Sequence, residues 1–216
     1  MTYLPPTPTE TEVTTPGTQV PENPPNFRRV QDNEIGVILG KKGSGKTTLS
    51  RHLAAQMKRK IILDSLGTDY GGGCIVSTPA DLVSYHKRVS EYDEFSIIAR
   101  PQSDEMPTAV FRLARRTPNS WLIVEECDRY ADAYKIQPDL AWLVNYARQQ
   151  NTSILCICRR AARLSRDITA NADWIVAHNT QEPRDLEYLA EYMNTAEIPH
   201  LQPFTYTRWG TTRLTF

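Results

Sequence analysis

The fold is indicated by one stretch of the chain, Gly40-Lys41-Lys42-Gly43-Ser44-Gly45-Lys46-Thr47, which matches the pattern G-x-x-x-x-G-K-[ST] at every position. A strand-like apolar run, Glu34–Leu39, precedes it, and a helix-like stretch, Thr47–Met57, follows. Glycines at these places let the backbone curl until its N–H groups point at a phosphate, and the helix adds its positive end. The pattern therefore predicts a phosphate-binding loop (P-loop). The alternative is a glycine-rich turn with an exposed lysine.

Each part of this loop has an expected role. Lys46 supplies a point charge for the β- and γ-phosphates, and Thr47 supplies a hydroxyl for Mg²⁺. ATP and Mg²⁺ are therefore the expected ligand and cofactor. The residues expected to bind ATP are Gly40, Lys41, Lys42, Gly43, Ser44, Gly45, Lys46, Thr47 and Thr48.

A second acidic site follows the apolar strand Trp121–Glu125, which ends in Glu125-Glu126. An acid at the tip of a buried strand beside the P-loop strand can hold the Mg²⁺ shell, a role we assign to Glu125 although Asp is usual there. A carboxylate one residue later, Glu126, can polarise the attacking water. This pair favours an ATP hydrolase over a small-molecule kinase. The alternative is two solvated acids at a strand end.

Strand-like and helix-like segments alternate along the rest of the chain. Strands without polar alternation, separated by helices, are typical of a mostly parallel sheet covered on both faces, so we predict an α/β fold. The strand Phe95–Ala99 lies between the P-loop strand and the acidic strand, and an inserted strand is typical of RecA-like motor ATPases. A β-hairpin is expected in residues 204–216, turning near Trp209-Gly210. Further strands are expected at Lys60–Asp64, Ser153–Cys158 and Asp173–Ala177, and further helices at Pro79–Arg88 (capped by Thr78), Thr108–Arg116, Asp139–Gln149 and Arg184–Tyr192.

Composition excludes several classes of protein. The 216 residues carry 25 basic and 25 acidic side chains, which excludes a strongly basic nucleic-acid coat and an acidic solvating chain. No apolar run approaches the ~20 residues of a membrane span, and the first residues do not resemble a signal peptide. Four cysteines are too few for a disulfide framework, so a reducing, intracellular location is expected.

Residues 1–26 differ from the remainder. They hold seven of the 15 prolines and no Lys or Arg. Such a segment buries too little apolar surface to offset its ordering entropy, so we predict a disordered tail and place the ATPase domain at residues 27–216. A docking role for the tail is the alternative.

Taken together, GKKGSGKT, WLIVEE, NYARQQNTSILCICRRAARL and DWIVAHNTQEPRDLEYL resemble the FtsK–HerA superfamily of DNA-pumping ATPases over residues 34–216. Within it, the chain is most similar to the genome-packaging ATPases of tailless viruses with an internal membrane. The resemblance implies a RecA-like fold, a homo-oligomeric and expectedly hexameric ring, ATP bound between subunits, and double-stranded DNA in the channel. It also implies a capsid vertex or portal protein as partner, and a location in the host cytoplasm or at the packaging vertex of the virion.

The same resemblance carries roles to single residues. The P-loop lysine and threonine match directly, and Glu126 matches the family's catalytic glutamate. Where the family commonly has Gln followed by Arg, this chain has Arg159 and Arg160. A guanidinium only donates hydrogen bonds, so Arg159 departs from that sensor role and we expect it to contact the γ-phosphate instead.

Arg184, in QEPRDL, falls where some relatives place an arginine finger that reaches a neighbouring subunit's ATP. Such a finger contributes ~10³–10⁵ in rate. The alternative is a first-turn helix residue paired with Glu187 or Asp185.

The surface that contacts DNA is weakly marked in the sequence. The segment 128–135 is a candidate channel loop in which Arg129 and Lys135 contact phosphates. An ordinary surface loop is an equal alternative, and Leu66–Gly73 is a weaker second candidate.

The leading functional hypothesis is an ATP-driven translocase that packages viral DNA. A plasmid or bacterial DNA-transfer ATPase and a phage-assembly ATPase are the nearest alternatives. A small-molecule kinase would need an arginine-rich lid, for which Arg112, Arg115 and Arg116 are the candidates. A binding module gated by ATP without turnover is the remaining class.

Overall fold

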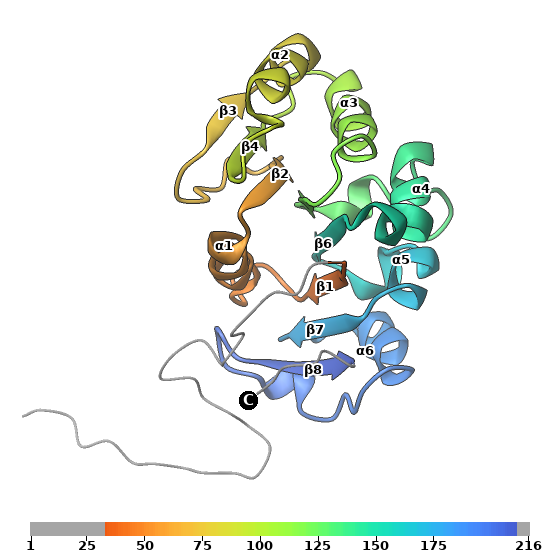
Figure 1. Ribbon diagram of the computed structural model, residues 1–216. Helices are drawn as coiled ribbons and strands as arrows, with labels where there is room; N and C mark the ends of the chain where they lie inside the picture. The colour runs from red at the N-terminus through yellow and green to blue at the C-terminus, as the bar shows by residue number, and fades with distance from the viewer. Residues whose placement is uncertain (1–32, 211–216) are drawn as a thin grey trace, which may run out of the picture.

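Strands and helices alternate along residues 33–210, the part of the chain that the computed structural model describes (Figure 1). The strands form one sheet in the order β3-β4-β2-β5-β6-β1-β7-β8, in which only β8 runs antiparallel to its neighbour. This confirms the predicted α/β class. The elements are β1 (Ile35–Leu39), α1 (Lys46–Gln56), β2 (Arg59–Leu63), β3 (Cys74–Val76), α2 (Pro79–Val89), β4 (Phe95–Ala99), α3 (Glu105–Ala114), β5 (Trp121–Val124), α4 (Pro138–Tyr146), β6 (Ser153–Cys158), α5 (Arg166–Ala170), β7 (Trp174–His178), α6 (Pro183–Ala190) and β8 (Tyr206–Gly210).

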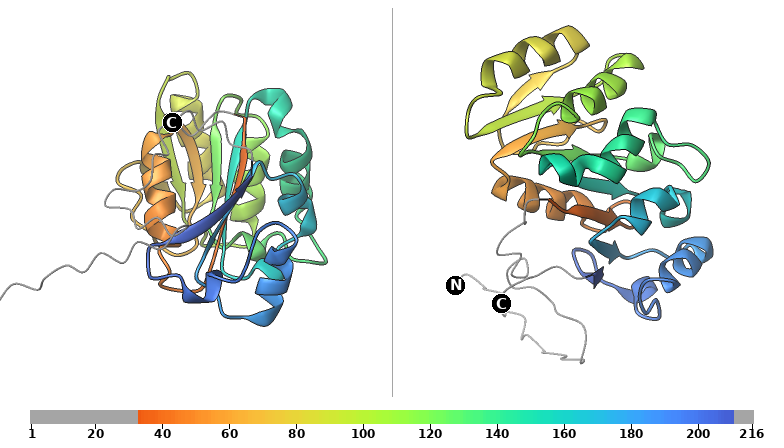
Figure 2. Two further views of the ribbon diagram at one scale, coloured as in Figure 1. Left: turned by 90° about the horizontal axis from the view of Figure 1, so that it is seen from below. Right: turned by 45° about the vertical axis from the view of Figure 1, so that its right-hand side comes forward.

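The two faces of the sheet are covered unequally. Helix α1 lies on one face, and α2 to α6 lie on the other, as the view from below makes plain (Figure 2, left). Leu49 and Leu53 of α1 pack against Ile38 of β1 in the smaller core. The larger core lies under the other helices and includes Phe111 and Leu143. Burial on both faces explains why the central strands are apolar throughout rather than alternating.

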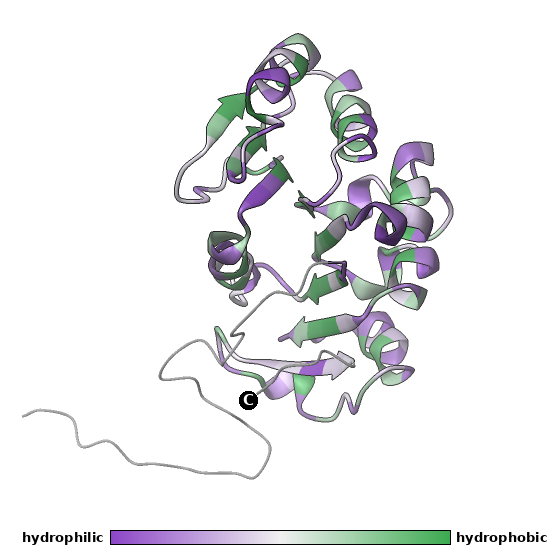
Figure 3. Cartoon of the chain, in the orientation of Figure 1, coloured by the Kyte–Doolittle hydropathy of each residue, from purple (hydrophilic) through white to green (hydrophobic). Residues whose placement is uncertain are grey.

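Hydropathy follows this arrangement. Figure 3 shows β1 and β7 green along most of their length, whereas the edge strand β8 is pale and purple. All five residues of β1 and all six of β6 are buried. The segments at the strand ends are free of this constraint and carry the polar groups.

Helix α2 begins as its sequence predicts. Pro79 occupies the first turn, where its missing N–H costs nothing, and the Thr78 side chain accepts a hydrogen bond from the Asp81 N–H at 3.2 Å.

The strand inserted beside the P-loop strand is not the one expected. The sheet order places β6 between β1 and β5, whereas Phe95–Ala99 (β4) lies on the far side of β2. The sequence suggested that the acidic strand β5 lies beside β1, but β6 separates the two strands. Chain order does not determine sheet order, because helical crossovers allow a strand to be laid down at either edge.

Two short elements had no sequence signal. Strand β3 has three residues and helix α5 has five, too few for a periodic pattern. The C-terminal antiparallel hairpin is formed by β8 with β7. The turn expected near Trp209-Gly210 is not at that place, because both residues belong to β8 and pair with β7. The rest of the expected hairpin segment and the predicted tail, residues 211–216 and 1–26, lie outside the described residues.

Because strands β1 to β7 are parallel, their carboxyl ends share one edge of the sheet. The P-loop follows β1, Glu125-Glu126 follows β5, Arg159 follows β6 and Asn179 follows β7. The sheet thus gathers at one edge the polar segments that the sequence holds far apart.

Within residues 33–210, no helix combines the length and the apolar character needed to cross a bilayer.

Gly36, in the middle of β1, is required by a close approach. A Cβ built on Gly36 would lie 2.1 Å from Cζ2 of the buried Trp174 indole. We predict that Gly36→Ala lowers the free energy of unfolding by about 1–3 kcal/mol, the usual cost of overpacking a core. Urea titration measures this change as a lower midpoint at constant slope.

The same substitution in a Trp174→Leu background is the control. With the indole gone, the added methyl group has room, so the two substitutions are expected to be non-additive in a double-mutant cycle. Strictly additive costs would contradict the steric explanation.

Candidate active site

The P-loop, residues 40–47, connects β1 to α1 at the carboxyl edge of the sheet. The Lys46 Nζ donates a hydrogen bond to the Lys41 carbonyl oxygen at 2.8 Å, across the mouth of the loop. Lys46 is only 8% exposed, and burial lowers the pKa of its ammonium group. A phosphate entering the loop would take over this ammonium from the Lys41 carbonyl.

The C-terminal part of the chain supports this loop through backbone hydrogen bonds. The Lys41 N–H donates to the Asn179 carbonyl at 3.0 Å, and the Phe204 N–H donates to the Ser44 carbonyl at 3.0 Å. Gly45, with φ of 108°, packs directly on Phe204, and a Cβ built there would lie 2.8 Å from the Phe204 Cα. Gly45 thus serves both the curl of the loop and its contact with Phe204.

His178, the last residue of β7, completes this support. Its Nδ1 lies 2.9 Å from the Thr205 carbonyl oxygen, so Nδ1 carries the hydrogen and donates. A Cβ built on Gly40 would lie 2.7 Å from the His178 Cβ. Burial, with a smaller contribution from the Lys46 charge, lowers the pKa of His178 to about 4. The imidazole is therefore neutral at pH 7.

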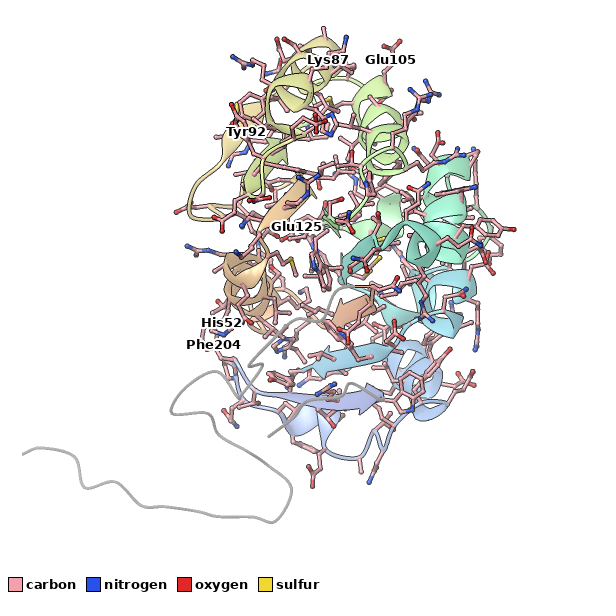
Figure 4. All side chains as sticks on the ribbon, in the orientation of Figure 1. His52, Lys87, Tyr92, Glu105, Glu125 and Phe204 are labelled. Carbon is pink, nitrogen blue, oxygen red and sulfur yellow. The ribbon has the colours of Figure 1, made fainter. Side chains whose placement is uncertain are left out.

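Glu125 lies deep in the interior at the end of β5 (Figure 4). It is 1% exposed, and its Oε1 accepts a short hydrogen bond from the Tyr70 hydroxyl. Burial is the main cause that raises the pKa of Glu125, and the nearby Asp64 carboxylate adds to it. One carboxylate oxygen is thus occupied by Tyr70, and the other has no hydrogen bond among the described residues.

Glu126, directly after it, has a different environment. Its backbone is left-handed, with φ of 49°, which turns the side chain away from the direction of β5. Arg159 Nη2 lies 2.6 Å from Glu126 Oε1, and Arg129 Nη1 lies 3.2 Å from Oε2. Because β6 is the neighbour of β5, the residue after β6 reaches the residue after β5. Both oxygens of the expected general base are held by guanidinium groups.

These groups line a common cavity of about 310 Å³. It holds seven of the residues that the sequence assigned to nucleotide, metal or catalysis. They are Lys42, Gly43, Lys46, Thr47, Glu125, Glu126 and Arg159, and the remaining lining residues are Leu66, Ile157 and Cys158. Gly40, Lys41, Ser44, Gly45 and Thr48 belong to the same loop and helix start without lining the cavity.

Arg184 does not line this cavity. It lies exposed on α6 and forms no ion pair with any residue in the described range 33–210. Its expected alternative partner Asp185 is instead held by Arg160 Nε at 2.8 Å and by the Ala162 N–H at 2.9 Å. Arg160 is thereby committed to α6, which leaves Arg159 as the arginine that faces the cavity.

Arg129 and Lys135, the two residues proposed to contact DNA, have different surroundings. Arg129 is bound to Glu126 at the edge of the site. Lys135 is exposed in a turn closed by Asp132, whose Oδ1 accepts from the N–H groups of Tyr134 and Lys135 at 2.8 and 2.9 Å. Tyr134 is 100% exposed at the tip of this turn.

Four residues of the site were not found from the sequence: Tyr70, His178, Asn179 and Phe204. Tyr70 lies in the loop Leu66–Gly73, which we proposed only as a weak DNA candidate, and it is buried against Glu125. No motif marks the other three: His178 ends β7, Asn179 follows it, and Phe204 precedes β8. The pairing of β7 with β1, and of β8 with β7, brings them to the P-loop.

No protein-family model and no curated protein matches the sequence. Solved structures do match the fold. The genome packaging NTPase B204 from Sulfolobus turreted icosahedral virus 2, in complex with AMP, aligns with a TM-score of 0.69 and 19% identity, over 84% of this chain and 94% of that chain. Its complex with ATP-gammaS aligns with a TM-score of 0.67 and 19% identity, over 82% and 92%.

B204, the DNA-packaging ATPase from Sulfolobus turreted icosahedral virus, aligns with a TM-score of 0.62 and 21% identity, over 83% of this chain and 93% of that chain. At these identities the likeness establishes the fold. The chain is thus similar over nearly the full length of these packaging NTPases, and the RecA-like P-loop fold implied by its motifs is the one it has.

The buried neutral His178 makes stability depend on pH. In the unfolded chain His has a pKa near 6.5, so the unfolded state takes up a proton first as the pH falls. Stability is therefore complete above about pH 6.5, falls between 6.5 and 4, and loses about 3 kcal/mol in total from this group. Denaturant titrations at a series of pH values measure the loss.

His178→Asn is the matched control, because the Asn amide keeps a donor for the Thr205 carbonyl and does not titrate in this range. The difference in pH dependence between the two proteins separates the contribution of His178 from that of carboxylates that titrate in the same pH range. An equal pH dependence in both would refute the assignment.

Proposed function

We propose that the chain is an ATP hydrolase that uses ATP and Mg²⁺ to translocate double-stranded DNA. In this proposal it packages a viral genome into a preformed capsid. One observation carries the proposal. The P-loop lysine, two acids of different environment and an arginine line one cavity at the carboxyl edge of a parallel sheet. In open α/β sheets this edge is where ligands bind.

The residues present fit a magnesium ion. Thr47 and Glu125 line the same cavity, and hydroxyl and carboxylate oxygens such as theirs suit Mg²⁺. Bound with ATP, the ion would neutralise charge on the β- and γ-phosphates. Tyr70 leaves one Glu125 oxygen available for this role and fixes the orientation of the carboxylate.

Glu126 is the expected general base, and its two arginines compete with a water molecule for it. Each Glu126 oxygen already accepts from one guanidinium group, which leaves fewer acceptor sites for the attacking water. The γ-phosphate offers Arg159 a competing anion at the mouth of the P-loop. We infer that Arg159 moves to the γ-phosphate when ATP binds, which releases Glu126 to accept a proton from the attacking water.

A small-molecule kinase is disfavoured by the position of its candidate lid. Arg112, Arg115 and Arg116 line a separate cavity with Asp139 and Trp142 and share no lining residue with the Lys46 cavity. Arg115 is bound to Asp139 at 2.5 Å and lies 4.4 Å from the centre of the Trp142 ring. These groups are engaged in packing α3 against α4.

The DNA part of the proposal draws on the structural likeness and on the loop after β5. The similar structures are a genome packaging NTPase and a DNA-packaging ATPase. In this chain the turn that carries Lys135 and the fully exposed Tyr134 begins at the catalytic acids. Movement at Glu126 would reach it through Arg129, so we propose Arg129 and Lys135 as DNA-contacting residues. The protein would then act in the host cytoplasm or at the packaging vertex, as a ring that contacts a capsid or portal protein.

Double-stranded DNA is expected to stimulate ATP hydrolysis with no phosphoacceptor present. Glu126→Gln is predicted to bind ATP with near-normal affinity and to hydrolyse it ~10²–10⁴-fold more slowly, because Gln keeps the shape but cannot take a proton. Isothermal titration and phosphate release separate the two effects. Glu125→Gln should instead raise the Mg²⁺ concentration needed for turnover.

Two controls define the outcome. Lys46→Ala should lose ATP affinity by ~10-fold or more, the cost of removing a charged donor from the phosphates. Glu105→Gln, an exposed acid far from Glu125 in Figure 4, should change neither property. Undiminished turnover in Glu126→Gln would reverse the roles of the two acids, and an unchanged affinity in Lys46→Ala would overturn the ATP site.

Arg184 is proposed to complete the ATP site of a neighbouring subunit in a ring. It is exposed, unpaired in the described residues, and outside the cavity of its own subunit. Arg184→Ala and Lys46→Ala subunits are each expected to be inactive alone. Mixed together they should regain part of the ATPase activity, because some interfaces then pair an intact P-loop with an intact arginine.

Sedimentation of each variant checks that both still assemble. A mixture that assembles and stays inactive would mean that Arg184 acts within its own subunit or only supports α6.

A further inference from the structure

Phe204 occupies an unusual position for a large apolar residue. Its φ is 68°, in the left-handed region that bulky side chains rarely adopt, and the residue is 59% exposed. Neither feature is explained by packing, because an exposed ring contributes little to a core. Strained residues that the surrounding structure holds in place are concentrated at ligand-binding sites, so this conformation calls for a functional explanation.

The conformation is imposed by contact with the P-loop. The Phe204 N–H is bonded to the Ser44 carbonyl, and its Cα and Cδ1 lie 2.8 and 3.1 Å from where a Cβ of Gly45 would be. The preceding segment is anchored as well, since the Asn179 side-chain amide donates to the carbonyls of Pro199 and Leu201 at 3.0 and 2.7 Å. The ring is therefore held at the rim of the phosphate loop on a fixed backbone.

The sheet order indicates which part of a nucleotide would reach Phe204. The cavity that holds Glu125, Glu126 and Arg159 lies on the β5–β6 side of β1, so the γ-phosphate and the attacking water belong there. Phe204 lies on the opposite side, beside β7 and β8. A triphosphate that lies in the P-loop with its γ-phosphate toward β5 must direct its sugar and base toward β7 and β8.

We propose that the nucleotide base stacks on the Phe204 ring. A bound base would cover the ring surface that is otherwise exposed. This inference rests on the proposed function as an ATP hydrolase and adds the base subsite to it. Stacking on an aromatic ring is available to every base, because each has a π-face. Phe204 should therefore favour a nucleotide over a bare polyphosphate without selecting adenine over guanine.

The test compares ATP, GTP and inorganic tripolyphosphate as ligands of the full chain, each with Mg²⁺, by titration calorimetry. Phe204→Gly removes the ring and accepts the left-handed backbone without strain. This variant should bind ATP and GTP roughly 5- to 100-fold more weakly, the range expected for losing one base–aromatic stack. Its affinity for tripolyphosphate should change by less than about twofold. Phe204→Tyr should keep both nucleotides near wild-type affinity.

Tyr92→Ala is the matched control, an exposed aromatic residue that lies away from Phe204, toward the α2 end of the molecule (Figure 4). Phe204→Leu keeps an apolar side chain without a π-face, and it replaces the glycine variant if that variant does not fold. If the Phe204→Gly variant loses affinity equally for all three ligands, Phe204 only supports the P-loop. If it loses affinity for none of them, the ring serves another contact. Either result would overturn the proposal that the base stacks on Phe204. Failure of the wild-type chain to bind ATP would overturn the proposed function itself, and this is seen before any variant is examined.

Discussion

The site depends on keeping a curled, glycine-rich backbone in one shape without a hydrophobic core of its own. Three of the hydrogen bonds that contribute are those from Lys46 to the Lys41 carbonyl within the loop, from Lys41 to the Asn179 carbonyl, and from Phe204 to the Ser44 carbonyl. Two of the three come from the last third of the chain. The C-terminal segments around β7 and β8 therefore do more than extend the sheet, because they hold the phosphate loop in place from outside it.

Two adjacent glutamates acquire different properties from their surroundings. Burial raises the pKa of Glu125, while the hydrogen bond from the Tyr70 hydroxyl lowers it in part and fixes one of the carboxylate oxygens. Glu126 instead lies between Arg159 and Arg129, which hold both of its oxygens. Separation of paired carboxylates by environment is how one site can provide a metal ligand and a base at the same pH. In the proposed hydrolase, these arginines would make the availability of Glu126 as a base depend on what else is bound in the cavity.

Sequence patterns were reliable where the physics is local. The P-loop requires its glycines and lysine at fixed spacing, and the Thr78 cap needs only its own helix, so both could be predicted residue by residue. Patterns failed where the outcome depends on distant partners. Phe95–Ala99 was correctly found as a strand but assigned the wrong neighbour, because the length of a crossover does not say on which side the next strand is laid down.

The sequence alone determined that a phosphate loop joins a buried strand to a helix, and that two acids end a second buried strand, because these features depend on spacing along the chain. Only the tertiary structure decided that β6 stands between those strands and brings Arg159 to Glu126. It also decided that Phe204 and His178 support the P-loop from residues more than a hundred positions away. Such contacts arise from the order in which strands pair, and that order is settled by packing across the whole sheet.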